Sequence, residues 1–228
     1  IRDLFSKQPL SKIRGFQAKH FSFNVDGGRC DTCKGEGEQL IEMQFLADVH
    51  LTCEDCNGHK FKESVLEVKY KDKNIYDVLE MSVDEAMEFF KDEKNIVTAI
   101  SPLQEVGLGY VKLGQSSSTL SGGEAQRVKL ASFLGKGKAN QSVLFILDEP
   151  TTGLHFHDIH KLLKAFNALL DQGHSLVIVE HNTDVIKAAD WVIDMGPEAG
   201  VNGGKLVYEG IPSGLSKCKP SQTGKYLG

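Results

Sequence analysis

Residues 143–150 read VLFILDEP, and residues 151–155 continue as TTGLH. The apolar run from Val143 to Leu147 is typical of a strand buried in a parallel sheet. Asp148 and Glu149 follow directly, at the carboxyl end of the strand, where α/β sheets bind their ligands. Asp-Glu alone would fit an acidic turn equally well. The stretch predicts an α/β core whose acidic residues emerge at its binding edge.

Strand and helix patterns alternate on the carboxyl side of this stretch. A helix is expected over about 159–170, with an apolar stripe on one face. A second buried strand is expected over Ser175–Val179, and His181 follows it. Further elements are a short helix over 185–189 and strands over 191–194 and 205–208. This repetition predicts crossover connections and a parallel sheet.

A glycine pair precedes the next helix toward the amino terminus. Ser121 and Glu124 have the spacing of a capping box, and Gly122 and Gly123 lie between them. A serine hydroxyl, exposed amides and the positive end of a helix dipole also make an anion site. Taken by itself, the motif S-G-G-E fits a capped helix better than an anion site.

Residues 30–119 mix cysteines, short strands and helices. Strands are expected over Leu40–Val49 and Ser64–Tyr70, and a helix is expected to begin at Ile75. Ser82 and Glu85 form a second capping box, which predicts a helix over 83–90. Another helix is expected over 96–106. A connection rich in glycine and serine then follows over 107–119.

Four cysteines form a C-x2-C-x19-C-x2-C frame, the spacing of a structural zinc site: Cys30, Cys33, Cys53 and Cys56. Gly35 and Gly58 each follow a knuckle and would relieve its tight backbone. Four unlinked cysteines or a redox pair are weaker alternatives, since neither pair follows a βαβ start. His50 and His59 are expected at the surface, because four thiolates complete a tetrahedral shell.

Composition fits a folded domain in a reducing compartment. The 228 residues are 40% hydrophobic, carry a net charge of −5 and contain no apolar run long enough for a membrane span. Four of the five cysteines belong to the metal frame, and Cys218 is expected to be a free thiol. No signal peptide is evident, so we expect a cytoplasmic location. Because the chain begins with Ile1, we expect it to be part of a longer protein.

Basic residues concentrate at the amino terminus. Residues 1–29 contain six lysines and arginines against two aspartates, a local charge of +4. Such a patch could contact DNA phosphates. The candidates are Lys12, Arg14, Lys19, Arg29, Lys34, Lys60 and Lys62. An ordinary solvated face is the alternative, because Glu36, Glu38, Glu54 and Asp55 offset the lysines of the cysteine frame.

Longer stretches carry a family resemblance. LSGGEAQRVKLA (120–131) resembles the signature of ABC-type ATPases, VLFILDEP their Walker B motif and TTGLH their D-loop, with His181 at the H-loop position. A cysteine frame just upstream is unlike transporters, which usually read LSGGQ. With GRCDTCKGEGEQLIEMQFLADV (28–49), CEDCNGHKF (53–61), YDVLEMSVDEAMEFF (76–90) and GLGYVKLGQSSSTLSGGEAQRVKLA (107–131), the whole chain resembles UvrA, the damage-sensing ATPase family of bacterial nucleotide excision repair.

The resemblance implies an α/β fold: a partial ABC-type ATPase domain with an inserted four-cysteine zinc module. Asp148 would orient Mg²⁺, Glu149 would activate water, and His181 would sense the γ-phosphate of ATP. Ser121, Gly122 and Gly123 would contact ATP held by an opposite domain. No G-x-x-x-x-G-K-[ST] loop is present, which suggests the part of a second nucleotide-binding domain that follows its Walker A motif. Without that loop, the chain alone is expected to lack ATPase activity.

The resemblance also implies a set of partners and a domain order. The partners are double-stranded DNA, preferentially damaged, UvrB, and a second copy of the full-length protein. The expected segments are a basic lead-in over 1–29, the zinc module over 30–63, a helical region over 64–119 and the ATPase region over 120–228. A UvrA-like paralogue linked to drug resistance, another cytosolic ABC protein and a zinc-ribbon interaction protein are the alternatives.

Overall fold

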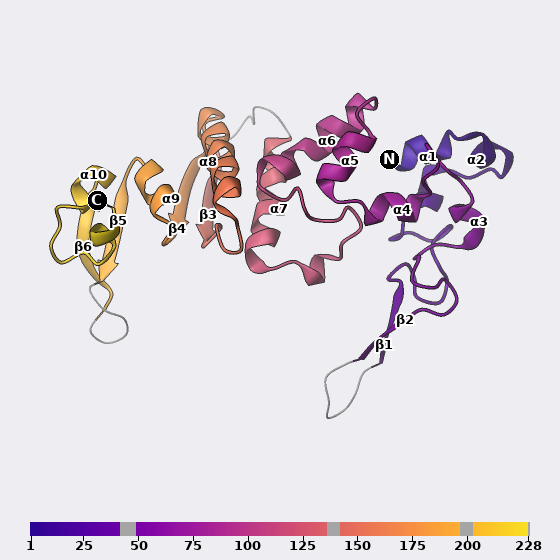
Figure 1. Ribbon diagram of the computed structural model, residues 1–228, viewed down its shortest axis with the longest axis horizontal. Helices are drawn as coiled ribbons and strands as arrows, with labels where there is room; N and C mark the ends of the chain where they lie inside the picture. Colours follow the sequence, from indigo (N-terminus) through magenta and orange to yellow (C-terminus); the bar gives the residue numbers. More distant parts are fainter. Residues whose placement is uncertain (42–48, 136–141, 197–202, 228) are drawn as a thin grey trace. The chain divides into compact units, whose positions relative to one another are not determined.

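A computed structural model describes residues 1–41, 49–135, 142–196 and 203–227 (Figure 1). The chain divides into two compact units. The first unit comprises Ile1–Ile96 and Val111–Gln115, and the second comprises Val97–Tyr110 and Ser116–Gly228. Helix α6 (Lys94–Glu105) belongs to both ranges.

The first unit combines short helices with one hairpin. Its elements in chain order are α1 (Arg2–Ser6), α2 (Pro9–Ile13), η1 (Ala18–Phe21), β1 (Glu38–Ile41), β2 (Val49–Thr52), α3 (Glu63–Leu66), α4 (Ile75–Glu80) and α5 (Val83–Phe89). Phe5 and Phe21 are buried, with their ring centroids 5.5 Å apart. The amino-terminal segment is therefore anchored by an aromatic core, although its surface is basic.

Two strand predictions fall in this unit. The predicted strand over Ser64–Tyr70 is wrong, because α3 occupies its start. Val65 and Val68 are the buried residues, and a spacing of three fits a helical turn rather than a strand. Strands β1 and β2 pair antiparallel, from Glu38 opposite Thr52 to Ile41 opposite Val49. Most of the predicted strand over 40–49 lies outside the described residues.

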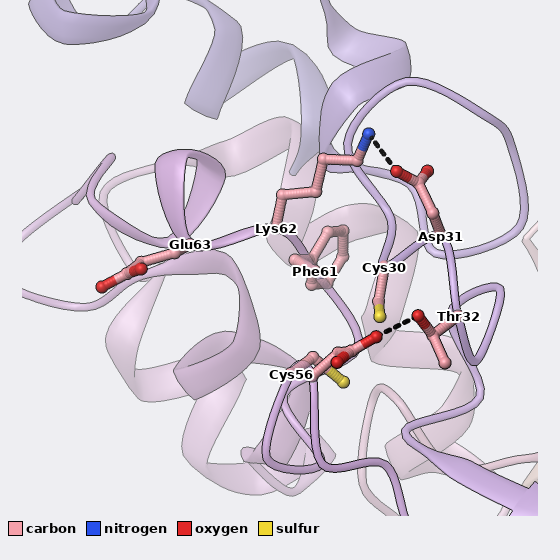
Figure 2. Close-up of a pocket in the computed structure, with 8 residues that line it drawn as sticks. Cys30, Asp31, Thr32, Cys56, Phe61, Lys62 and Glu63 are labelled. Carbon is pink, nitrogen blue, oxygen red and sulfur yellow. Dashed lines mark hydrogen bonds and ion pairs between the residues drawn. The ribbon is translucent and has the colours of Figure 1, made fainter.

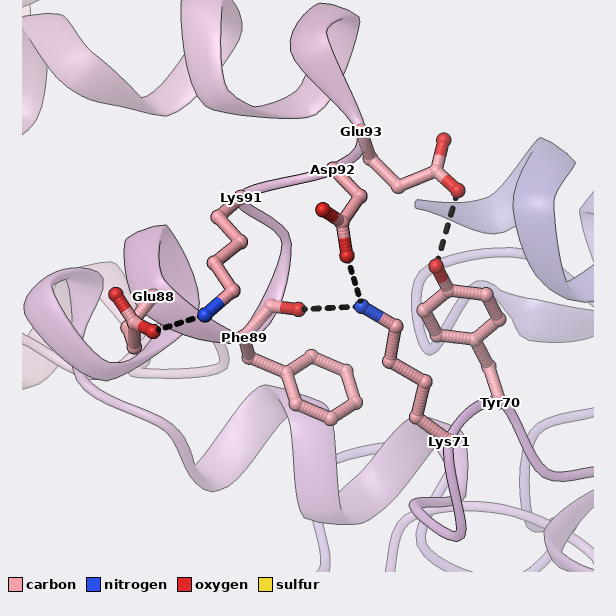
Figure 3. A network of polar contacts seen from close by, with 7 residues as sticks. All are labelled: Tyr70, Lys71, Glu88, Phe89, Lys91, Asp92 and Glu93. Carbon is pink, nitrogen blue, oxygen red and sulfur yellow. Dashed lines mark hydrogen bonds and ion pairs between the residues drawn. The ribbon is translucent and has the colours of Figure 1, made fainter.

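Capping boxes position α4 and α5. The amide of Ser82 donates to Glu85 Oε2 at 2.8 Å, and the amide of Glu85 donates to Ser82 Oγ at 3.2 Å. This reciprocal pair confirms the predicted start of α5, and α4 begins at Ile75 as expected. The polar network of Figure 3 reaches the carboxyl end of α5, where Lys71 donates to the Phe89 carbonyl at 3.4 Å and to Asp92 at 2.8 Å. In the same network Tyr70 donates to Glu93 at 3.0 Å.

The second unit contains the predicted α/β elements. They are η2 (Ser117–Thr119), α7 (Gly122–Leu134), β3 (Leu144–Asp148), α8 (Phe156–Asp171), β4 (Ser175–Val179), α9 (Thr183–Ala188), β5 (Val192–Gly196), β6 (Lys205–Gly210), α10 (Pro212–Leu215) and η4 (Thr223–Tyr226). In the described part of the chain, no helix is long and apolar enough to cross a bilayer.

Strands β3 and β4 form a parallel pair joined by α8 (Figure 1). Leu144 lies opposite Ser175, and Asp148 lies opposite Val179, which confirms the parallel α/β prediction. Strands β5 and β6 instead pair antiparallel in a separate sheet. A parallel crossover needs a dozen or more residues, and the link over 197–204 is shorter than that.

One face of the β3–β4 pair is apolar and exposed. Leu147 is 6% exposed, whereas Ile146 beside it is 71% exposed, and Val177 on β4 is 51% exposed. Full burial of these strands was expected from their apolar runs, so the prediction is wrong for this face. The described residues cover only the face that carries Leu147, where α8 contacts β4.

The two faces of β3 should therefore respond differently to truncation. We expect Leu147→Ala to lower the free energy of unfolding by about 2–4 kcal/mol, because it leaves a cavity. Ile146→Ala should stay within about 0.5 kcal/mol, as for an exposed position. Urea unfolding followed by the fluorescence of Trp191, the single tryptophan, measures both in the second unit. Equal losses of unfolding free energy in the two variants would show that Ile146 is also packed in the folded chain.

Candidate nucleotide and metal sites

The four frame cysteines converge on one point in the first unit. Their sulfur atoms all lie within 4.8 Å of one another, and each residue is at most 7% exposed. Cys30 and Cys53 Sγ are 3.9 Å apart, and Cys33 and Cys56 Sγ are 3.6 Å apart. A tetrahedral Zn²⁺ with bonds of about 2.3 Å requires sulfur separations of about 3.8 Å. The cluster therefore has the size and donor set of a zinc site with four thiolate ligands.

The backbone takes the same turn after each cysteine pair. Lys34 and Gly35 have φ values of 52° and 92°, and Asn57 and Gly58 have values of 47° and 80°. Positive φ at Gly35 and Gly58 confirms that the glycines serve the knuckle backbone. The amide of Gly37 donates to Cys33 Sγ at 3.2 Å. Amide donors of this kind stabilise thiolates that bind a metal.

The thiols of the cluster hold protons tightly where burial dominates. Burial raises the pKa of Cys56 to about 12, and burial also raises the pKa of Cys33. For Cys30 the effect of burial is outweighed by backbone hydrogen bonds from Cys33 and Thr32, which leave its pKa below the usual value. A metal that binds here must displace protons, so its affinity should rise with pH.

Polar contacts surround the cysteine cluster (Figure 2). Lys62 pairs with Asp31 at 2.7 Å, and Thr32 donates to Asp55. His50 is exposed and lies 3.2 Å from Glu38. The His59 ring packs on Tyr76, with centroids 4.6 Å apart, and is likewise exposed. Neither histidine belongs to the cluster, in agreement with the surface positions expected for them.

The predicted DNA-contacting residues fall into two groups. Arg14 pairs with Glu67, and Arg29 pairs with Asp26 at 2.6 Å, so their charges are partly neutralised, like that of Lys62. Lys60 donates to the Gly114 carbonyl at 3.2 Å and lies over the Phe23 ring. These four side chains form the first group. The second group has exposed side chains that take no part in these ion pairs and ring contacts, and its members are Lys12, Lys19 and Lys34.

The glycine pair of the signature stretch opens α7. Ser121 Oγ accepts from the Glu124 amide at 3.3 Å, and the Ser121 amide donates to Glu124 Oε2 at 2.7 Å, which confirms the capping box. Tyr110 donates to Glu124 at 2.5 Å, and this contact is the main reason that the pKa of Glu124 is lowered. Ser121 and Gly122 are exposed, and the serine proton remains available to an incoming anion.

The acidic edge of β3 is brought next to the predicted histidine. Asp148 and Glu149 are exposed, and His181 Nε2 lies 3.5 Å from Glu149 Oε1. Glu149 has a φ of 45°, a left-handed conformation that costs free energy for a residue with a side chain. Strained backbone of this kind is common at functional sites. At this edge the structure thus brings Glu149 and His181 together.

Two residues to which the sequence assigned no role hold the turn after β3. Arg127 on α7 is 1% exposed and donates to the carbonyls of Pro150 at 2.7 Å and Thr152 at 3.3 Å. Glu180 accepts from the Thr151 amide at 2.8 Å and from its hydroxyl at 2.5 Å. Arg127 lies within the signature stretch and Glu180 directly precedes His181. Their closeness to these motifs was the only feature of the sequence that could have pointed to them.

Comparisons with known proteins agree with this geometry. A family model described as "ABC transporter" matches residues 40–152. "UvrABC system protein A" of Rickettsia bellii (strain RML369-C) is 53% identical over 227 residues, and that of Staphylococcus aureus (strain COL) is 55% identical. Each alignment covers 100% of this chain and 24% of the relative. The chain thus spans about a quarter of the length of these curated relatives.

A solved structure shows the same fold. The crystal structure of UvrA2 from Deinococcus radiodurans matches with a TM-score of 0.86 and 47% identity, over 99% of this chain and 28% of that one. The parallel strand pair, the capped signature helix and the cysteine cluster define a region of an ABC-type ATPase with a four-cysteine module. Within that class, the chain belongs to the UvrA family.

The cysteine cluster should bind one Zn²⁺ per chain. We expect Cys53→Ser to lose this metal, because the substituted residue is fully buried and one thiolate of the shell is removed. The module over 30–63 should then become sensitive to protease. Unfolding of the second unit, followed by Trp191 fluorescence, should keep its midpoint. Metal analysis of the purified chain gives the stoichiometry.

Cys218→Ser is the matched control, because Cys218 lies outside the cluster and should not affect metal content. Zinc affinity should be lower at pH 6 than at pH 8, since the raised pKa values of Cys33 and Cys56 make protons compete. A fully folded, protease-resistant module that contains no metal would contradict the assignment.

Proposed function

We propose that the chain is part of the damage-recognition ATPase subunit of nucleotide excision repair. The observation that carries the proposal is the edge of β3 and β4, where Glu149 and His181 lie 3.5 Å apart in a chain that also presents the signature helix. Its relatives are named as protein A of the UvrABC system, which supports excision repair as the pathway.

The chain would contribute to ATP hydrolysis at two different sites. Asp148, Glu149 and His181 belong to one site, in which Glu149 takes the proton of the attacking water and His181 contacts the γ-phosphate. Ser121 and the amides at the start of α7 would contact ATP bound by an opposite domain, whose Walker A motif grips the phosphates. Each site is therefore completed by segments that the printed sequence does not contain.

Mg²⁺ fits the strand edge. The ion prefers carboxylate and water oxygens, and Asp148 offers an exposed carboxylate where ligands of parallel sheets bind. When bound with ATP, Mg²⁺ neutralises charge on the phosphates. Asp148 would hold it through its water shell, and Glu149 would remain available to the attacking water.

The first unit would serve DNA recognition. A structural zinc would fix the module from which the exposed hairpin β1–β2 extends. Double-stranded DNA, preferentially damaged, would be bound through phosphate contacts from exposed lysines, and the full-length protein would dimerise and load UvrB in the cytoplasm. These partners are inferred from the similarity of the chain to UvrA proteins.

A paralogue function is the second candidate. One solved structure with the same fold is that of a UvrA2, and a paralogue linked to drug resistance would share both the cysteine cluster and the ATPase edge. Its 47% identity is lower than the 53–55% identity to protein A of the UvrABC system, which favours the repair assignment. Binding of the full-length protein to lesion-bearing and undamaged duplexes separates the two candidates.

ATP hydrolysis should depend on Glu149 in the full-length protein. Glu149→Gln should still bind ATP but lower steady-state turnover by about 10²–10⁴, the usual contribution of a positioned general base. Ser121→Ala should instead impair the site of the opposite domain and leave the site that contains Glu149 unchanged. The 228-residue chain alone should show negligible turnover at saturating Mg-ATP. Turnover by the chain equal to that of the full-length protein would place the site elsewhere.

DNA affinity should depend on the exposed lysines. Removing one phosphate contact lowers the slope of log K against log salt by about 0.9 on duplex DNA. Changing Lys12, Lys19 and Lys34 to alanine in the full-length protein should lower both slope and affinity. Arg14→Ala and Arg29→Ala should have smaller effects, since these arginines already pair with carboxylates. An unchanged slope in the triple variant would exclude this surface as the DNA-binding face.

A further inference from the structure

We infer that Glu180 is a positioning residue for hydrolysis, because its carboxylate joins the turn after β3 to the loop after β4 and so sets His181 against Glu149. The inference rests on the proposed ATPase function and adds a residue that lies outside the motifs described above. Glu180 has its own contacts within the second unit, and none of them is to the reacting atoms.

The two carboxylate oxygens of Glu180 accept hydrogen bonds from two different segments of the chain. Oε1 accepts from the amide of Thr151 at 2.8 Å and from its hydroxyl at 2.5 Å. Oε2 accepts from the amides of His181 at 2.8 Å and Asn182 at 3.0 Å. Four donors thus converge on one side chain, from two segments that lie 29 residues apart in sequence.

These contacts reach both members of the hydrolytic pair. Thr151 follows Glu149 by two positions in the same turn, and the Thr152 amide closes that turn on the Glu149 carbonyl at 3.1 Å. His181 is the next residue after Glu180. The backbone on either side of the 3.5 Å approach between Glu149 and His181 is therefore held by one carboxylate.

The electrostatics require an ionised carboxylate. Partial burial by itself would raise the pKa of Glu180, but the hydrogen bonds from Thr151, Asn182 and His181 outweigh burial and lower it. A charged carboxylate accepts all four hydrogen bonds, and such charge-assisted bonds are stronger than neutral ones. A glutamine would present its NH₂ group to one of the two donor pairs, which would separate the two segments.

A simpler role would be to start α9. Glu180 lies just before Asn182, whose own side chain accepts from the amides of Asp184 and Val185 and already caps the helix. The contacts to Thr151 contribute nothing to that helix end. They are needed only if the turn after β3 must keep a fixed distance from His181.

The test uses the full-length protein and compares ATP turnover with ATP affinity. We expect Glu180→Gln to lower kcat by about 10–100-fold, the usual cost of a displacement of roughly 1 Å, and to leave KM within about twofold. Glu209→Gln is the matched control on the exposed face of β6 and should leave both parameters unchanged. Unchanged kcat in Glu180→Gln would overturn the inference.

A double-mutant cycle with His181 separates positioning from general loss of structure. If Glu180 acts by placing His181, then Glu180→Gln should lower single-turnover hydrolysis by less than about twofold in the His181→Ala background. An equal loss in both backgrounds would show that Glu180 acts elsewhere and would overturn the inference. Turnover by Glu149→Gln at the wild-type rate would instead refute the proposed function.

Thr151 carries the test if Glu180→Gln fails to fold. Thr151→Val removes one hydroxyl donor and should lower kcat with KM unchanged, whereas Thr151→Ser keeps the donor and should restore turnover. Equal kcat for the valine and serine variants would overturn the inference. Both variants retain the Glu180 carboxylate, so the result does not depend on tolerance of an altered charge.

Discussion

The register between β3 and β4 determines the geometry of the nucleotide edge. Asp148 lies opposite Val179, and one further backbone bond, from the Glu149 amide to the Val179 carbonyl at 2.8 Å, extends the pairing by a step. The residues that follow, Glu149 on one side and Glu180 on the other, therefore leave the sheet together. A shift of one residue would turn every side chain of a strand to the opposite face and would separate the groups that meet here.

The turn after β3 is the second constraint, because its backbone is strained at Glu149. Glu149 and Gly153 both have positive φ, at 45° and 77°, and only the glycine adopts such a conformation at no steric cost. Arg127 binds the turn through carbonyl oxygens and Glu180 binds it through a neighbouring amide and hydroxyl. The cationic Arg127 side chain thus binds the acceptor groups of the turn, and the anionic Glu180 side chain binds its donor groups. Together they hold the strained residue Glu149 in place. Arg127 belongs to the signature helix, so this turn connects that helix to the edge that carries Glu149.

Sequence patterns predicted the features that depend on local spacing. The capping box at Ser121, the knuckle glycines and the parallel strand pair all follow from residues close together in the chain. The segment over 64–70 was misassigned because Val65 and Val68 bury a helical turn in a stretch whose composition also fits a strand. For Glu180 the only signal in the sequence was its place next to His181, because the two donors from Thr151 are brought near only by the folded sheet.

The charges of the first unit limit which residues could contact the DNA proposed as a partner. Four thiolates around one Zn²⁺ leave a net negative charge, which neighbouring cations and amides must offset. An arginine or lysine already paired with a carboxylate, such as Arg29 with Asp26 or Lys62 with Asp31, would give up that ion pair to bind a phosphate. An exposed lysine gives up only water and counterions. The number of basic residues therefore overstates the positive charge that this unit can offer to a duplex, and their contacts, more than their clustering in sequence, determine where a phosphate would bind.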